Sequence, residues 1–185
     1  MSTNEWYTRP KYIEAAREVM GGIDLDPASC AAANEIVKAE RYFTKEQNGL
    51  CQEWRSRSLW LNPPYARSEH YQSGIGLFIK KCLEVYEDGD ILQAIILATT
   101  EVNAKWFQPL WYYPICFADH RVKFIAPQID PRGVYQHMFG TCFVYLGPNE
   151  VKFAEVFSQF GRIVKAIDAP KGKPVERELW LEVAL

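Results

Sequence analysis

Residues 91–98 read ILQAIILA, an apolar run in which only Gln93 carries a polar side chain. The run follows a helix-like segment and the turn Glu87-Asp88-Gly89-Asp90. It is far shorter than the ~20 apolar residues that a membrane span needs. A short run of this kind, rich in β-branched residues, predicts a strand buried on both faces of a parallel sheet.

Helices and further strands are expected to alternate along the rest of the chain. Helical periodicity begins at Pro10, with Thr8 as a candidate cap, and stops at Gly21-Gly22. The other expected helices cover Ala28 to Glu40, Ile75 to Tyr86, Asn103 to Phe107 (ended by Pro109) and Glu150 to Phe160. The other expected strands cover Ile23 to Leu25, Ser58 to Leu61, Ile115 to Ala118, Val122 to Ile125, Gly140 to Leu146 and Arg162 to Ile167, and Tyr42 to Trp54 is expected to be a structured loop.

This alternation predicts an α/β fold, in which one sheet is covered by helices on both faces. The chain has 185 residues, 48% of them hydrophobic and 24% charged, which fits one globular domain rather than a disordered segment. We expect a single domain over residues 1–168. Residues 169–185, which include Pro170 and Pro174, are expected to form a C-terminal tail.

The charge balance and the cysteines restrict the functional classes. There are 21 Lys and Arg against 23 Asp and Glu, so the net charge is 21 − 23 = −2, and any nucleic-acid binding must use a local positive surface. The polar N-terminus and the absence of a long apolar run predict neither a signal peptide nor a membrane span. The five cysteines are Cys30, Cys51, Cys82, Cys116 and Cys142, and no two of them form a CxxC pair. We therefore expect free thiols in a cytosolic protein and no metal site.

The tetrapeptide Asn62-Pro63-Pro64-Tyr65 directly follows one of the expected strands, where ligands bind in open α/β sheets. Two successive prolines stiffen the backbone, and the Pro63 carbonyl has no N–H of Pro64 beside it. This carbonyl and the Asn62 side-chain oxygen are two fixed acceptors, which suit an –NH2 group with two hydrogens to donate. Tyr65 offers a flat face for the ring that bears the amine. The alternative interpretation is a rigid turn without a chemical role.

Such a pair of acceptors would activate an exocyclic amine of adenine or cytosine. The amine is a poor nucleophile because its lone pair is delocalised into the ring. Accepting both hydrogens favours tetrahedral nitrogen and stabilises the positive charge that grows during attack, which is electrostatic preorganisation. The electrophilic methyl group must then lie in line with the nitrogen, at roughly 3 Å, and no metal is needed.

The chain resembles the phage DNA N6-adenine methyltransferase family, small Dam-like enzymes of bacteriophages and prophages, over Glu5 to Ile167. The resemblance rests on the order of several segments: Glu5-Trp6-Tyr7-Thr8, Asp24-Leu25-Asp26-Pro27-Ala28-Ser29, Asn48-Gly49-Leu50 with Trp54, the Asn62 to Tyr65 loop, Lys105-Trp106-Phe107 and Arg121-Val122-Lys123-Phe124. It implies site-specific adenine N6-methylation of DNA with S-adenosylmethionine, in the cytoplasm of a bacterial host. It also implies a minimal Rossmann-like methyltransferase sheet. Since Asp26 and Asn62 are only 62 − 26 = 36 positions apart, we expect that sheet to be trimmed relative to the full fold.

The resemblance also implies roles for individual residues. The catalytic loop would be Asn62, Pro63, Pro64 and Tyr65. The cofactor would contact Tyr7 and Thr8 near its methionine part, Asp26, Pro27 and Ala28 at the first cofactor motif, Asn48, Gly49 and Leu50 near its adenine, and Asn62. The first motif usually continues with glycines, whereas Ser29, Cys30 and Ala31 stand here.

DNA would be contacted by residues that follow these motifs. A base buried in a duplex must be flipped out to reach the site, and Tyr65 would stack on it. Phosphate contacts could come from Arg67, Lys105, Arg121 and Lys123, although for each residue alone a solvated surface charge is the favoured interpretation. Phe124 faces either the target base or the core.

Two further functional hypotheses stay open at the level of sequence. The same loop could methylate cytosine N4, RNA or a protein glutamine, because it specifies an –NH2 group and not its carrier. A non-catalytic nucleic-acid-binding α/β protein is the alternative from another class, supported by the missing glycines after Asp26.

Overall fold

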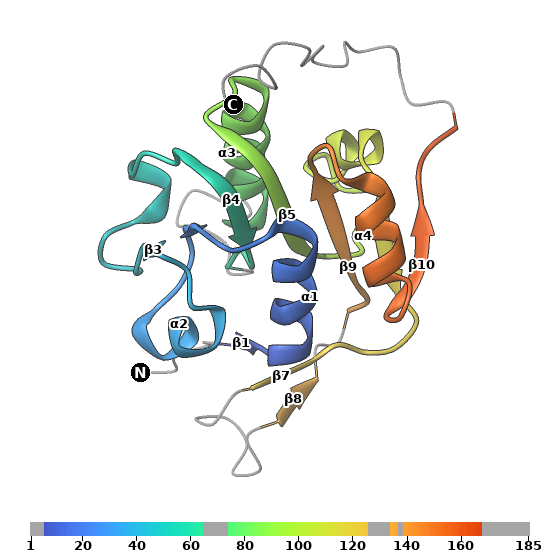
Figure 1. The fold of residues 1–185 in the computed structure, drawn as a ribbon, viewed down its shortest axis with the longest axis horizontal. Helices are drawn as coiled ribbons and strands as arrows, with labels where there is room; N and C mark the ends of the chain where they lie inside the picture. The colour runs from blue at the N-terminus through green and yellow to red at the C-terminus, as the bar shows by residue number, and fades with distance from the viewer. Residues whose placement is uncertain (1–5, 65–73, 126–133, 137–138, 168–185) are drawn as a thin grey trace.

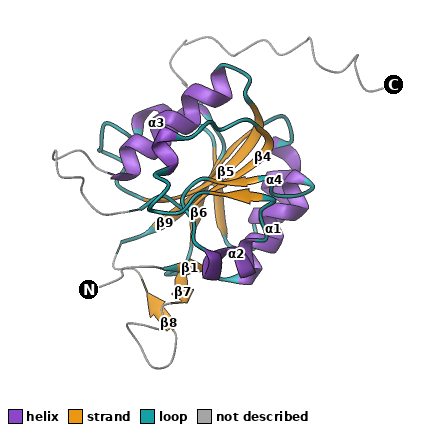
Figure 2. Cartoon of the chain, turned by 90° about the vertical axis from the view of Figure 1, so that its left-hand side faces the viewer, coloured by secondary structure: helices purple, strands orange, loops and turns teal. Residues whose placement is uncertain are grey.

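The computed structural model describes residues 6–64, 74–125, 134–136 and 139–167, and it shows a sheet with helices on both faces (Figure 1 and Figure 2). Within these residues the main sheet has seven strands: β2 (Leu25–Asp26), β3 (Arg41–Tyr42), β4 (Ser56–Leu61), β5 (Ile91–Thr99), β6 (Ile115–Ala118), β9 (Thr141–Leu146) and β10 (Gly161–Val164). Their order across the sheet is β10-β6-β9-β5-β4-β2-β3.

Strand β5 contains the apolar run and lies in the middle of the sheet. It is parallel to β4, with Leu61 opposite Ile96, and antiparallel to β9, with Thr99 opposite Thr141. Strand β2 is parallel to both β3 and β4, whereas β6 is antiparallel to β9 and β10. The predicted buried strand is confirmed, but the expected parallel sheet is a mixed one. The reason is that β9 enters the sheet at the edge where β5 ends, so it must run in the opposite direction.

The helices divide between the two faces of the sheet. One face packs on α1 (Pro10–Met20), α2 (Ala31–Val37) and α4 (Glu150–Phe157), and the other packs on α3 (Gly74–Glu87) and the 3-10 helix η2 (Gln108–Tyr112). Figure 2 shows α1 and α4 on one side of the strands and α3 on the other. Strand alternation explains this division: Trp60 is buried against the α1 face, whereas its neighbour Leu59 is buried against the α3 face.

A smaller antiparallel sheet lies beyond the end of β4. It consists of β1 (Tyr7–Thr8), β7 (Lys123–Ile125) and β8 (Val134–Gln136), with β7 in the middle and Thr8 opposite Phe124. Both views place this small sheet at one end of the molecule, below the main sheet (Figure 1 and Figure 2). Only β7 was expected from the sequence, within the segment Val122 to Ile125.

Two expected helices differ from the structure. The helix over Asn103 to Phe107 is wrong, because these residues form turns and η2 begins only at Gln108. Pro109 therefore opens a helix instead of ending one, which suits a residue without an N–H to offer in the first turn. The helix over Ala28 to Glu40 is shorter than expected. Cys30 caps it by accepting a hydrogen bond from the Ala33 N–H, and Lys38 ends it in the left-handed conformation.

Other sequence expectations have mixed outcomes. Thr8 does not cap α1, because Arg9 occupies the N-cap position and makes no side-chain capping bond. All five cysteines are free, and burial raises the pKa of the thiols of Cys82, Cys116 and Cys142, whereas Cys51 is exposed. None of the helices in the described part of the chain has both the length and the hydropathy needed to cross a membrane. The expected tail, residues 169–185, lies outside the described residues.

Candidate active site

The chain reverses its direction of travel across the sheet at β2. From β2 it passes through α2 to β3 on one side, and then returns to β4 on the other side of β2. Such a reversal in an open α/β sheet marks the place where ligands bind, beyond the carboxyl ends of the two strands. Asp26 ends β2 and Asn62 follows β4, so two of the expected site residues lie at this edge.

Asp26 is a buried carboxyl group at this edge. Only 2% of the residue is exposed, and its Oδ1 accepts a hydrogen bond of 3.2 Å from the Ala28 N–H. No ion pair joins it to a cationic side chain within the described ranges. Burial raises its pKa from 3.8 to about 7, against the opposing effect of the Ala28 N–H and the Ser29 hydroxyl. A buried carboxyl group of this kind suits a ligand that brings its own positive charge.

The 3-10 helix η1 (Gly49–Cys51) packs against the segment that follows Asp26. A Cβ atom on Gly49 would lie 1.9 Å from the Pro27 carbonyl oxygen, so only glycine allows the two backbones to approach so closely. Asn48 precedes it in the left-handed conformation, with φ of 52°, and is exposed. The structure thus brings together the two segments, 26–28 and 48–50, that the sequence assigned to the cofactor.

Helix α3 fixes η1 from the other side. The Lys81 ammonium donates to the carbonyl oxygens of Leu50, at 2.7 Å, and Gln52, at 2.5 Å, and lies over the Trp54 ring. The Trp54 Nε1–H donates to the Gly49 carbonyl at 2.7 Å, and the indole is 1% exposed. Trp54 is therefore a core residue. The role of Lys81 was not predicted, since a surface-type cation at helical spacing gives no sign of carbonyl partners.

Asn62 is held by the segment that precedes α1. Its Nδ2 lies 3.3 Å from the Trp6 carbonyl oxygen and 3.4 Å from the Thr8 Oγ1. Pro63 is buried and Pro64 is exposed, so the diproline turns from the interior to the surface. The other expected residues of this loop, Tyr65 and Arg67, lie outside the described residues. The contact to Trp6 was not predicted, because a backbone carbonyl leaves no trace in the sequence.

Strand β1 joins this loop to the small sheet. Tyr7 and Thr8 are buried, and Thr8 pairs with the fully buried Phe124 on β7. The rings of Trp6 and Phe124 are 6.2 Å apart, so Phe124 packs within the protein. Helix α2, which follows the Asp26 segment, also contacts β1. Tyr7 and Thr8 thus lie between the Asp26 segment and the Asn62 loop.

The candidate DNA contacts within the described residues surround the same edge. Lys105 lies in the turns after β5, Arg121 lies between β6 and β7, and Lys123 is the first residue of β7. All three residues are exposed. They follow the carboxyl ends of β5 and β6, which point toward the edge that carries Asn62. In the described part of the chain, no group of three or more His, Cys, Asp or Glu side chains could hold a metal ion.

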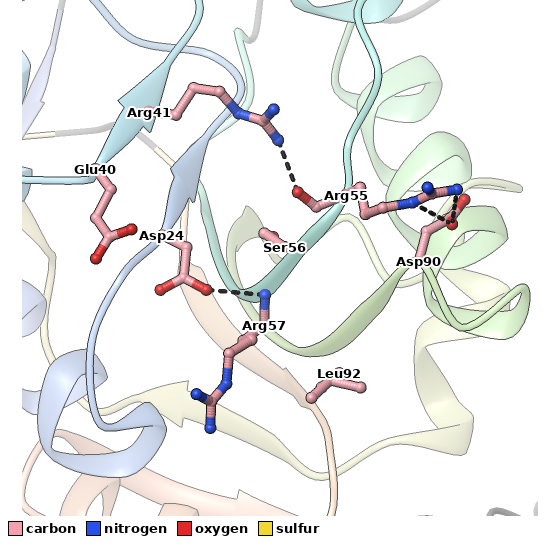
Figure 3. Close-up of a pocket in the computed structure, with 8 residues that line it drawn as sticks. All are labelled: Asp24, Glu40, Arg41, Arg55, Ser56, Arg57, Asp90 and Leu92. Carbon is pink, nitrogen blue, oxygen red and sulfur yellow. Dashed lines mark hydrogen bonds and ion pairs between the residues drawn. The ribbon is translucent and has the colours of Figure 1, made fainter. Parts of the chain in front are cut away.

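A pocket is present at the opposite, amino-terminal edge of the sheet (Figure 3). Its polar groups largely satisfy one another: Arg55 pairs with Asp90 at 3.2 Å, and the Asp24 carboxylate accepts the Arg57 N–H at 2.8 Å. Ser56 begins β4, so this pocket and the Asn62 loop lie at opposite ends of the same strand. We therefore do not place the active site in this pocket.

The fold and this edge define the class: an α/β protein in which the edge formed by the carboxyl ends of the parallel strands carries the buried Asp26 side chain and an Asn-Pro-Pro loop. The chain belongs to the family described as DNA N-6-adenine-methyltransferase (Dam), whose sequence model matches residues 2–139. It is also similar to the DNA N-6-adenine-methyltransferase of Haemophilus phage HP1 (strain HP1c1), with 31% identity over 65 residues. That match covers 35% of this chain and 37% of the phage protein, and no solved structure matches.

Proposed function

We propose that this protein is an adenine-specific DNA N6-methyltransferase that uses S-adenosylmethionine. Membership of the Dam family supports the reaction class, and the Asn62 loop at the carboxyl edge of the sheet supports the site. One observation carries the proposal. The Asn62 side chain is fixed by contacts with Trp6 and Thr8, and it lies at the same edge of the sheet as the buried Asp26. In this proposal the sheet is a trimmed Rossmann-like methyltransferase sheet, with β3 as the strand between β2 and β4 along the chain.

The residues at the edge fit S-adenosylmethionine. This cofactor supplies a methyl group activated by a positively charged sulfonium, and its methionine part carries an ammonium group. Asp26 would hold a cationic part of it, since the carboxyl group is buried without a cationic side chain among the described residues. The remaining contacts would come from Pro27, Ala28, Asn48, Gly49 and Leu50 on one side and from Tyr7 on the other. Thr8 and Asn62 would border the cofactor there and contribute little to its affinity. The segment after Asp26 lacks the usual glycines, but the close backbone approach beside it is provided by Gly49.

Asn62 and Pro63 would activate the target amine. The Asn62 side-chain oxygen and the Pro63 carbonyl accept the two amine hydrogens, which localises the nitrogen lone pair and stabilises the positive charge that develops. Pro64 has no N–H that could compete for the Pro63 carbonyl. No residue needs to act as a general base before the attack.

The duplex must deliver the adenine to this edge. Flipping a base costs a few kcal/mol, and stacking on Tyr65, worth about 1–3 kcal/mol, would offset part of that cost. Arg67, Lys105, Arg121 and Lys123 would contact phosphates around the flipped nucleotide. Phe124 would act indirectly, as the buried support of Thr8 and Trp6.

Transfer of a labelled methyl group to unmethylated DNA tests the proposal. Nucleoside analysis should find N6-methyladenine; N4-methylcytosine, or label only in RNA or protein glutamine, would establish the corresponding alternative acceptor. Calorimetry with S-adenosylhomocysteine tests the non-catalytic alternative, which predicts no binding. Asn62→Ala should abolish transfer while cofactor affinity stays largely intact. Asn149→Ala, an exposed asparagine that makes no side-chain capping bond to α4, is the matched control and should retain full activity.

A further inference from the structure

Two contacts of the Asn62 side-chain nitrogen are made with one short segment. The Trp6 carbonyl and the Thr8 hydroxyl lie two residues apart on either side of Tyr7, at 3.3 and 3.4 Å from Nδ2. Both distances are slightly longer than those of most N–H···O hydrogen bonds. We propose that Thr8 is a positioning residue for Asn62, a role that rests on the proposed function and differs from the cofactor contact expected of Thr8.

The chemistry of the partners determines which end of the Asn62 amide faces them. A backbone carbonyl can only accept hydrogen bonds, so the group that faces Trp6 must be the Nδ2 amine and not the oxygen. The second hydrogen of the amine is then directed to Thr8 Oγ1. The amide is planar, so these two contacts turn its oxygen away from β1. An asparagine that accepts a hydrogen from an amine must present this oxygen and not its own N–H groups.

The structure holds Thr8 firmly enough to serve this purpose. Thr8 is 3% exposed, and its backbone pairs with Phe124 on β7. Phe124 is fully buried and packs on Trp6, so the two acceptors share one support. Thr8 is buried and Asn62 is half-buried, so losing the hydroxyl removes one of the contacts that orient the Asn62 amide. The amide can then rotate and present the wrong end to the substrate.

Steady-state kinetics of three variants test this role. Thr8→Val removes the hydroxyl at nearly constant volume and should lower kcat about tenfold, the equivalent of one lost hydrogen bond. Thr8→Ser keeps the hydroxyl and should stay within about threefold of the native kcat. In Thr8→Val, the KM for DNA and the affinity for S-adenosylhomocysteine should change by less than about twofold. Thr141→Val is the matched control, since Thr141 is a buried threonine on β9 whose hydroxyl has no partner among the described residues.

A second measurement uses the ligand-free protein and does not depend on activity. The side-chain NH2 resonances of Asn62, assigned by their absence in Asn62→Asp, should shift in Thr8→Val and remain unchanged in Thr141→Val. If Thr8→Val does not fold, Thr8→Ala provides the same comparison. An inactive native protein would refute the proposed function, while the resonances would still report the contact.

Three results would overturn the role of Thr8. Unchanged Asn62 resonances in Thr8→Val would show that the hydroxyl does not hold the amide. A loss of S-adenosylhomocysteine affinity equal to the loss of kcat would make Thr8 a cofactor contact. A Thr8→Ser variant as slow as Thr8→Val would show that the hydroxyl is not what matters.

Discussion

Gly49 approaches Pro27 so closely that a Cβ atom on Gly49 would lie 1.9 Å from the Pro27 carbonyl oxygen. The two residues are 22 positions apart and belong to the two segments that flank the proposed cofactor site. A backbone oxygen cannot rotate away as a side chain can, so any larger residue must separate the segments. This contact gives the Asn48-Gly49-Leu50 segment a structural reason for its glycine.

Gly49→Ala should therefore both destabilise the protein and weaken cofactor binding. Overpacking of this kind costs about 1–3 kcal/mol, and each kcal/mol lowers Tm by roughly 2–4 °C in a chain of this size. Thermal unfolding and calorimetry with S-adenosylhomocysteine measure the two effects. Gly22→Ala is the matched control, because an added Cβ there meets nothing within 4 Å. An alanine at 49 that is tolerated as well as the one at 22 would disprove the close approach.

Asp26→Asn should stabilise the ligand-free protein above neutral pH. Folding raises the pKa of Asp26 from 3.8 to about 7, so the folded state binds the proton more tightly than the unfolded state. The native chain therefore loses stability as pH rises from about 4 to about 7, and it does not regain that stability above pH 7. Asparagine has a similar shape and no charge, so the Tm of Asp26→Asn at pH 8 should exceed that of the native chain. Asp88→Asn, an exposed aspartate, should leave Tm unchanged.

Cofactor affinity should depend on pH in the opposite sense. With a pKa of about 7, roughly a tenth of Asp26 is ionised at pH 6 and nine tenths at pH 8, so a ligand whose ammonium group pairs with Asp26 should bind about tenfold tighter at pH 8. Calorimetry with S-adenosylhomocysteine at both pH values measures this. Asp26→Asn should bind weakly at both. A native affinity independent of pH between 6 and 8 would remove Asp26 from the cofactor site.

Lys81→Met should destabilise the position of η1, although the Lys81 side chain is not itself a proposed cofactor contact. The ammonium donates to the Leu50 and Gln52 carbonyls, which methionine cannot do, so we expect a loss of about 1–3 kcal/mol and a weaker affinity for S-adenosylhomocysteine. Thermal unfolding and calorimetry test both effects. Lys80→Met is the neighbouring control, since Lys80 is exposed and its ion pair among the described residues is with Glu84 at 3.6 Å. Equal effects of the two substitutions would show that the carbonyl contacts of Lys81 contribute nothing.

The elements that carry regular hydropathy were predictable. Helix α3 lies where its helical periodicity predicted it, and strand β5 lies where its almost continuous apolar run predicted it. Long elements that bury one or both faces leave such clear patterns in the sequence. The direction of β9 was not predictable, since an apolar strand has the same composition whether its neighbour runs parallel or antiparallel. Strand β1 is two residues long and owes its conformation to pairing with β7, so its own sequence contains no signal.

The positions of the candidate site residues in the fold were predictable to a similar degree. Strand ends are visible in the sequence, so Asp26 and Asn62 could be placed at one edge before the structure was known. What holds these residues was not visible, because the partners are backbone atoms: the Trp6 carbonyl for Asn62 and the Ala28 N–H for Asp26. Short segments distant in sequence supply such partners, and only the three-dimensional fold brings them together.

Lys123→Ala should weaken binding to DNA of any sequence and reduce its salt dependence. Lys123 is exposed on β7, the strand that pairs with β1 and so lies beside Asn62. A lysine that contacts one phosphate contributes about 0.9 to the slope of log K against log salt concentration, so its loss should lower the slope by about one unit. Fluorescence anisotropy with labelled duplexes between low and moderate salt measures this. Lys152→Ala is the control: Lys152 lies on α4 and pairs with Glu18 at 2.9 Å, near the amino-terminal edge of the sheet. If both substitutions change the slope equally, Lys123 affects DNA binding only through the net charge of the protein, and β7 does not contact the phosphates.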